Sequence, residues 1–124
     1  MDDFERAFRF YSPIMQTLDF ALKFREPDYP WEGSKEPGVA RPLFLVGRPW
    51  DGNAAQPGNG QMVALLAPSR NAVDAAYAAA LAHGGTDEGA PGLRPHYHAN
   101  YYGAYFRDPE GNKLCVCCHD PTGA

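Results

Sequence analysis

The stretch that decides the fold is YYGAYFRDPEGNKLCVCCH, residues 101–119. It contains two strand-forming runs, 101–107 and 112–119, on either side of a four-residue turn sequence, DPEG. Asp108-Pro109 and Gly111 are typical of a tight turn, because proline presets the backbone and glycine adopts conformations closed to other residues. The stretch therefore predicts a strand, a tight turn and a second strand at the end of the chain.

Tight closure of this turn places Tyr105 roughly opposite Cys115, to within one residue of register. Side chains alternate between the two faces of a strand, so Tyr101, Gly103 and Tyr105 share one face. Gly103 would leave room for a ligand between the two phenols, each of which can stack or form a hydrogen bond. Phe106 points the other way and is expected to pack towards a helix.

The second strand brings thiols and an imidazole to one face, because Cys115, Cys117 and His119 alternate along it. Ligands of these types suit zinc or copper, but a tetrahedral site needs further ligands from elsewhere. A reactive thiol is the second alternative. The third, which the residue types favour, is that small cysteines simply fill space in the sheet.

A helix is expected over residues 3–17, with Asp3 as its N-cap. Pro13 lies inside this pattern and is expected to kink or break the helix there. The apolar residues recur with helical spacing and predict one buried stripe: Phe4, Ala7, Phe8, Tyr11 and Met15.

A second helix is expected from Ser69, its N-cap, to Gly84-Gly85, its stop signal. Aligning Tyr11 with Tyr77 superimposes the two helical patterns, and each is followed by about three strands, so the chain reads as two copies of one unit. A strand over 61–67 precedes the second helix, whereas its counterpart in the first copy would lie before Met1. The first copy is therefore expected to lack its opening strand.

The remaining strands are expected at 19–26, around Trp31 within a loop over 27–40, at 41–48, and once within 86–99.

Composition sets broad limits on function. The chain has 124 residues, of which 44% are hydrophobic and 21% charged, and a formal charge of −4, which fits one globular domain. Isolated basic residues without a cluster argue against nucleic-acid binding. No apolar run is long enough for a membrane span, and the acidic amino terminus is unlike a signal peptide. A cytoplasmic protein with reduced cysteines is expected.

The doubled βαβββ unit, with AVDAAYAAALAHGG followed by NYYGAYFRDPEGNKLCVCCH, resembles the glyoxalase/bleomycin-resistance/dioxygenase group, the vicinal oxygen chelate superfamily. Its most specific part is the aromatic–x–Asp–Pro–acid–Gly–Asn sequence before an apolar strand. The resemblance implies a single α+β domain of two modules, 1–58 and 59–124, that curl around a cleft, usually in a homodimer. It does not fix a reaction, because members of the group catalyse several or only sequester drugs.

Members that catalyse reactions bind a divalent metal through His, Gln and Glu. The resemblance places the expected histidine at Met62 and the expected glutamate at Cys115, while the strand around 42–47 offers no carboxylate. It therefore implies no metal ligands here and no cofactor; a divalent metal is possible but disfavoured.

The leading hypothesis is a protein that binds a small apolar or aromatic molecule in a cleft walled by Met62, Tyr101, Tyr105 and Cys115. The alternative is a metal-dependent lyase or dioxygenase of the same superfamily with non-standard ligands. His98, which would share a face with His96 if the chain is extended there, is a weak candidate for acid–base catalysis. The expected partners are the ligand and a second copy of the chain, with no nucleic acid and no membrane.

Overall fold

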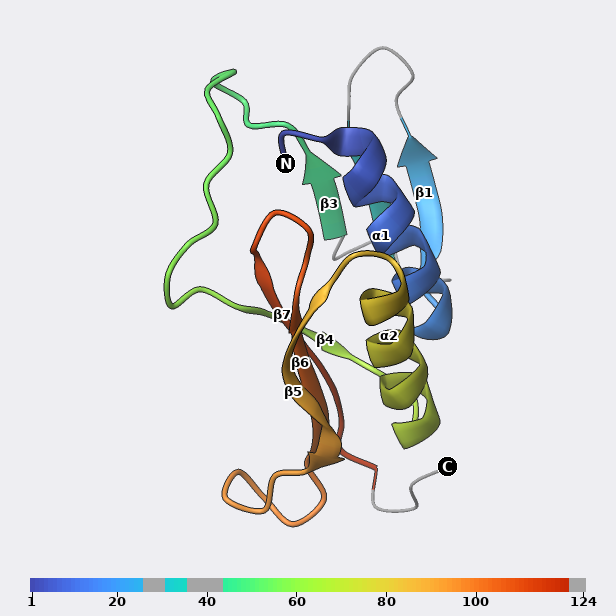
Figure 1. The fold of residues 1–124 in the computed structure, drawn as a ribbon. Coiled ribbons are helices and arrows are strands. Elements are labelled where there is room, and N and C mark those ends of the chain that lie inside the picture. Colours follow the sequence, from blue (N-terminus) through green and yellow to red (C-terminus); the bar gives the residue numbers. More distant parts are fainter. Residues whose placement is uncertain (26–30, 36–43, 121–124) are drawn as a thin grey trace.

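The structure, a computed structural model, describes residues 1–25, 31–35 and 44–120. Two helices lie side by side, and each is followed by antiparallel strands (Figure 1). The elements in chain order are α1 (Phe4–Thr17), β1 (Ala21–Arg25), β2 (Trp31–Lys35), β3 (Phe44–Gly47), β4 (Val63–Leu66), α2 (Arg70–Ala82), β5 (Thr86–Leu93), β6 (Tyr102–Arg107) and β7 (Lys113–Cys118). This is the α+β arrangement that the duplicated pattern predicted.

The strands form two sheets, with the orders β1-β2-β3 and β4-β7-β6-β5. In the second sheet β4 runs parallel to β7, and the other neighbours are antiparallel. Within the described ranges the first sheet has no strand beside β3 that would correspond to β4. The amino group of Met1 instead donates a hydrogen bond to the Gly47 carbonyl, at 2.9 Å. None of the helices described is long and apolar enough to cross a bilayer.

Helix α1 begins where predicted, because the Asp3 carboxylate accepts a hydrogen bond from the Arg6 N–H at 3.0 Å. It continues through Pro13 to Thr17, so a break there was a wrong expectation. Proline removes only one helical hydrogen bond, and packing of the flanking turns holds the helix together. The predicted stripe was incomplete. Phe8 is only partly buried, and the helix buries six residues: Phe4, Ala7, Phe10, Tyr11, Ile14 and Met15.

Helix α2 presents small residues to the core, among them Ala76 and Ala80, so it can approach α1 closely. Ser69 caps it as predicted, by accepting a hydrogen bond from the Ala72 N–H at 3.0 Å.

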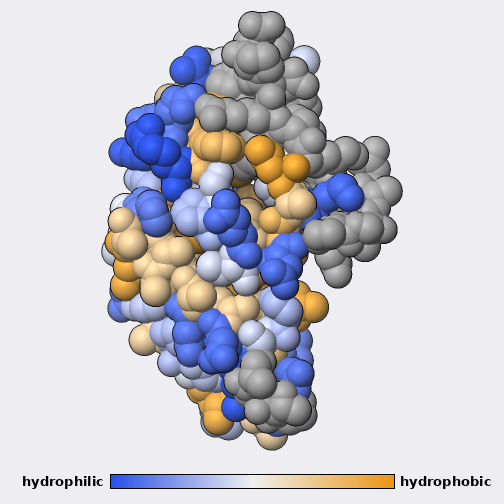
Figure 2. Space-filling model, turned by 90° about the vertical axis from the view of Figure 1, so that its right-hand side faces the viewer, coloured by the Kyte–Doolittle hydropathy of each residue, from blue (hydrophilic) through white to orange (hydrophobic). Residues whose placement is uncertain are grey.

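Seen from the side in Figure 2, the surface interleaves hydrophobic and hydrophilic residues. The core between the helices and the second sheet includes Phe106, whose ring lies 6.1 Å from that of Phe10 on α1. The expected direction of Phe106 is confirmed.

The DPEGN sequence forms the β6–β7 turn and organises it through one buried carboxylate. Asp108, only 2% exposed, accepts hydrogen bonds from the N–H groups of Glu110 and Asn112 and from the Asn112 side chain, each at 2.9 Å. It also accepts the Tyr11 hydroxyl of α1 at 2.6 Å. The motif thus links the second module to the first helix.

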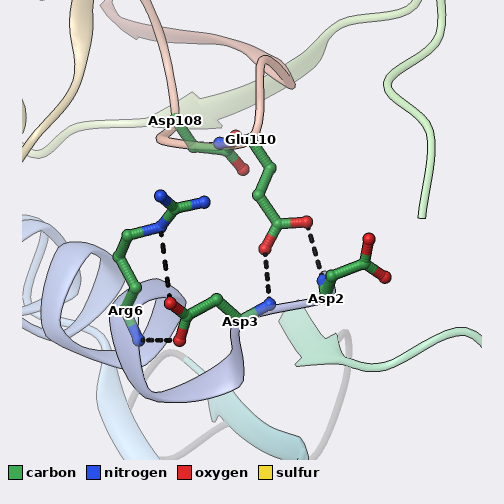
Figure 3. A network of polar contacts seen from close by, with 5 residues as sticks. All are labelled: Asp2, Asp3, Arg6, Asp108 and Glu110. Atoms are coloured by element: carbon green, nitrogen blue, oxygen red, sulfur yellow. Dashed lines mark hydrogen bonds and ion pairs between the residues drawn. The ribbon is translucent and has the colours of Figure 1, made fainter. Parts of the chain in front are cut away.

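Glu110, in the same turn, extends this link to the start of the chain (Figure 3). Its carboxylate accepts hydrogen bonds from the N–H groups of Asp2 and Asp3, at 2.7 and 3.1 Å. A carboxylate at a helix N-terminus satisfies N–H groups that have no partner within the helix and interacts favourably with the helix dipole. The turn therefore holds the amino-terminal segment against the second module.

Candidate functional site

The second sheet has one face against the helices and one turned away from them. Leu114, Val116, Cys118 and Phe106 belong to the core. The opposite face, called here the open face, carries the alternate residues: Ala64 and Leu66 from β4, Cys115 and Cys117 from β7, and Tyr105 from β6. Tyr105 lies opposite Cys115, as the hairpin predicted.

Two phenols and a thiol meet on the open face. The Tyr101 hydroxyl lies 3.2 Å from the Tyr105 hydroxyl and 3.2 Å from the Cys115 sulfur. Tyr101 precedes β6, and its ring folds back over Gly103, where a Cβ would lie only 2.8 Å from the Tyr101 Cε1. The room that Gly103 was expected to leave for a ligand is therefore taken by the Tyr101 ring, a long-range placement that alternation along the strand does not reveal.

Met62 lies at one end of the same face. It immediately precedes β4, two residues before Ala64, which is paired with Cys115. Its side chain is 46% exposed. Of the four residues predicted to line the site, the structure thus brings Tyr101, Tyr105 and Cys115 into contact and leaves Met62 at the margin.

Sequence reasoning missed Arg94 and the glycines of β5. The Arg94 guanidinium carbon lies 5.5 Å from the centre of the Tyr105 ring. A Cβ at Gly89 would lie 3.1 Å from the Tyr105 Cδ2, and one at Gly92 would lie 3.1 Å from the Arg94 Nη1. Small residues on β5 therefore allow large side chains to lie over the sheet. The signal in the sequence was a glycine-rich strand next to a tyrosine-rich one.

The histidines pair differently from the expectation. Residues 95–97 and 99–100 form turns, so His96 and His98 do not lie on one face of an extended segment. His96 stacks on Tyr97, with ring centres 4.2 Å apart. The His98 Nε2 lies 2.8 Å from the His119 Nδ1, and the His119 Nε2 lies 3.9 Å from the Cys117 sulfur.

The hydrogen bonds around Cys115 change the acidity of the cluster. The Cys117 thiol, followed by the Tyr101 and Tyr105 hydroxyls and the charge of Arg94, lowers the pKa of Cys115 to about 6, against an opposing effect of burial. The hydrogen bond to Cys115, with burial, raises the pKa of Cys117. Burial first and then the bond to Cys115 raise the pKa of Tyr101. Negative charge in this cluster is therefore favoured on Cys115.

The residues at the positions of the family's metal ligands do not fit such a metal. Met62 offers a half-exposed thioether, and the Cys115 sulfur already lies 3.2 Å from the Tyr101 hydroxyl. Neither is the oxygen or nitrogen donor that the family's His, Gln and Glu ligands supply. Across residues 1–25, 31–35 and 44–120, no three His, Cys, Asp or Glu side chains are grouped so as to hold an ion.

Comparisons with known proteins agree with this architecture. The model of the glyoxalase/bleomycin resistance protein/dioxygenase superfamily matches residues 1–116. A glyoxalase/bleomycin resistance protein from Albidiferax ferrireducens is 32% identical, with a TM-score of 0.82 over 94% of this chain and 90% of that one. A superfamily member from Sphaerobacter thermophilus is 25% identical, with a TM-score of 0.59 over 94% and 88% of the two chains.

A lactoylglutathione lyase from Agrobacterium tumefaciens shares the fold at 21% identity, with a TM-score of 0.58 over 94% of this chain and 86% of that one. No curated protein matches the chain. The family model covers nearly the whole chain and the fold is shared, so the chain belongs to the glyoxalase/bleomycin resistance protein/dioxygenase superfamily.

Proposed function

We propose that the protein binds a small apolar or aromatic molecule on the open face of its four-stranded sheet, without a divalent metal centre. The observation that carries this proposal is the pair of partly exposed phenols, Tyr101 and Tyr105, whose hydroxyls lie 3.2 Å apart beside Cys115. Aromatic walls with a few polar atoms favour a flat ligand with a hydrogen-bonding group.

Apolar side chains around the phenols support the same ligand class. Met62 is 46% exposed and Leu66 is 61% exposed. Met62 immediately precedes β4 and Leu66 is the last residue of β4, the strand that pairs with β7 at Cys115. Contiguous exposed apolar residues on a sheet face are typical of binding surfaces. A ligand that displaced the Tyr101 ring from its position over Gly103 would find these residues and Tyr105 as its walls.

Benzylacetone, a ketone with an aromatic ring and no reactive double bond, is a suitable probe. Calorimetry should show saturable binding to the wild-type protein and at least about fivefold weaker binding to Tyr105→Ala, because an aromatic contact contributes about 1 kcal/mol beyond its buried area. Trp50→Ala is the matched control, since Trp50 is 96% exposed and should leave the affinity unchanged. Equal affinities of the two variants would contradict the site.

Elemental analysis tests the metal-free part of the proposal. Protein purified without chelator and without an affinity metal should contain far less than one equivalent of zinc, nickel, iron or manganese. A stoichiometric ion that is lost on mutation of Met62 or Cys115 would instead favour a metal-dependent lyase or dioxygenase with non-standard ligands.

A further inference from the structure

The Cys115 sulfur is the point at which several hydrogen-bond donors converge. The Tyr101 hydroxyl lies 3.2 Å from it and also 3.2 Å from the Tyr105 hydroxyl, and the Cys117 thiol lies on the same face two residues along β7. Each of these neighbours carries a proton that it can donate. Such donors stabilise the thiolate form of the sulfur, because a thiolate has no proton and can only accept hydrogen bonds.

His98 and His119 extend this series of hydrogen bonds, and their tautomers set the direction of donation. The Asn100 N–H donates to the His98 Nδ1 at 3.1 Å, so a neutral His98 carries its proton on Nε2. That proton is directed at the His119 Nδ1, 2.8 Å away. A neutral His119 then carries its proton on Nε2, which faces the Cys117 sulfur at 3.9 Å. Each donor in this series therefore points from the exposed His98 towards the thiols, with Cys115 as the final acceptor.

We propose that Cys115 is a nucleophile that captures an electrophilic ligand at this site, an α,β-unsaturated ketone or aldehyde that carries a planar apolar group. This inference rests on the proposed binding function and adds the chemical class of the ligand. The apolar surroundings select the planar group, and the thiolate selects a soft, electron-poor carbon.

The addition is balanced without any oxidant, reductant or metal. The Cys115 thiolate forms a bond from Sγ to the β-carbon of the enone while the carbon–carbon π bond breaks, and that electron pair moves to the carbonyl oxygen. The resulting enolate takes one proton at its α-carbon from the Tyr101 hydroxyl, which regains a proton from solvent. The product is a thioether, and the protein gains the mass of the whole ligand.

Access to the sulfur depends on Tyr101. Cys115 is fully buried, and the Tyr101 hydroxyl lies 3.2 Å from its sulfur while the Tyr101 ring lies over Gly103. Tyr101 is itself partly exposed and lies at the end of the segment that joins β5 to β6. Capture at the sulfur therefore requires the Tyr101 side chain to rotate away from its position over Gly103.

The acidity of the cluster agrees with this chemistry. The groups that face Cys115 are Cys117 on β7, Tyr105 on β6, Arg94 after β5 and Tyr101 on the turn. On β4 the residue opposite is Ala64, which does not titrate. Together these groups lower the pKa of Cys115 to about 6, so a large fraction of thiolate is present at neutral pH.

Intact-mass spectrometry with benzylideneacetone, the unsaturated analogue of benzylacetone, tests the proposal. The wild-type protein should gain the mass of one ligand, and Cys115→Ser should gain none. Cys118→Ala is the matched control, because Cys118 lies on the opposite face of the same strand and should leave labelling unchanged. Circular dichroism of each variant checks that it is folded.

The pH profile separates an activated thiol from an ordinary one. The labelling rate should be half-maximal near pH 6, the pKa of Cys115, rather than about 8.5 as for an unperturbed cysteine. Tyr101→Phe keeps the ring but removes one donor, and should move the midpoint upward by about one pH unit.

Three outcomes would overturn the inference: addition to Cys117 or Cys118 at a similar rate, a midpoint near that of a free cysteine, or no adduct in the wild-type protein and in Tyr101→Ala. These results are distinguishable from failure of the proposed function. If benzylacetone binds and benzylideneacetone forms no adduct, binding stands and nucleophilic capture fails. If benzylacetone does not bind, the proposed function itself fails.

Discussion

At the scale of single residues, the most distinctive sequence motif has a structural role. The Asp108 carboxylate, almost fully buried, receives hydrogen bonds from two backbone N–H groups, the Asn112 side chain and the Tyr11 hydroxyl. A buried carboxylate is tolerated only when such donors replace water. The DPEGN sequence therefore links the β6–β7 turn to α1 through the Asp108 carboxylate.

Tyr11→Phe should lower the free energy of unfolding by about 2 kcal/mol, because it removes a hydrogen bond to a buried charged group. Urea denaturation measures the loss. Tyr77→Phe is the matched control, since Tyr77 occupies the corresponding helix position but forms an exposed hydrogen bond to Asp87 at 2.9 Å. Its loss should be below about 0.5 kcal/mol. Similar losses in the two variants would show that the Tyr11 bond to Asp108 does not link the modules.

At the scale of elements, the junction between α2 and β5 packs tightly against residues of both helices. Gly84 ends the α2 region with a φ of 96°, in the left-handed region that favours glycine. Gly85 follows, and a Cβ there would lie 2.7 Å from the Ala80 carbonyl oxygen and 2.8 Å from the Phe10 ring. The Gly-Gly pair thus stops one helix and also lets the chain pass close to Phe10 of the other helix.

Gly85→Ala should destabilise the fold by about 1–3 kcal/mol, because its methyl group meets a backbone carbonyl and a buried ring that cannot move away easily. Thermal unfolding followed by circular dichroism measures the effect. Gly92→Ala, within β5, is the control: its Cβ would lie 3.1 Å from the flexible end of Arg94. A Gly85 variant as stable as the Gly92 variant would mean that the helix–strand junction has room to spare.

At the scale of the whole molecule, the first sheet leaves apolar residues uncovered. Leu22 on β1 is 52% exposed and Leu45 on β3 is 50% exposed. Within the described ranges β2 is the only strand that pairs with β3, and the Met1 amino group bonds to the Gly47 carbonyl at the end of β3. Proteins cover or pair such edges, and a symmetric dimer is the commonest way to do so. We therefore propose a homodimer whose interface lies along the first module.

Light scattering at micromolar concentration should give twice the mass of the chain. Leu45→Lys should shift the protein towards the monomer, because a charge placed in an apolar interface loses its hydration. Leu81→Lys is the control, since Leu81 is also partly exposed, at 40%, but lies on α2. A monomer mass for the wild-type chain would defeat this prediction.

Several features followed from the sequence alone, and each depends on neighbours along the chain. Helical spacing located both helices, Ser69 and Asp3 marked their starts, and the DPEG turn set the register that pairs Tyr105 with Cys115. Turn chemistry and the alternation of side chains are local properties, so they can be derived without knowledge of the rest of the molecule. The helix break that the same local rules allowed at Pro13 is not present, because packing outweighed one lost hydrogen bond.

Tertiary structure alone decided the contents of the site. Alternation placed Cys115 and Tyr105 on one face, but it could not show that Tyr101 folds over Gly103 or that His98 meets His119. These contacts join a turn to strands that are distant along the chain, and they form only because the sheet order brings β5, β6 and β7 together. A sequence pattern specifies the face on which a side chain lies. The partner it meets there is decided by the free energy of packing all the elements at once.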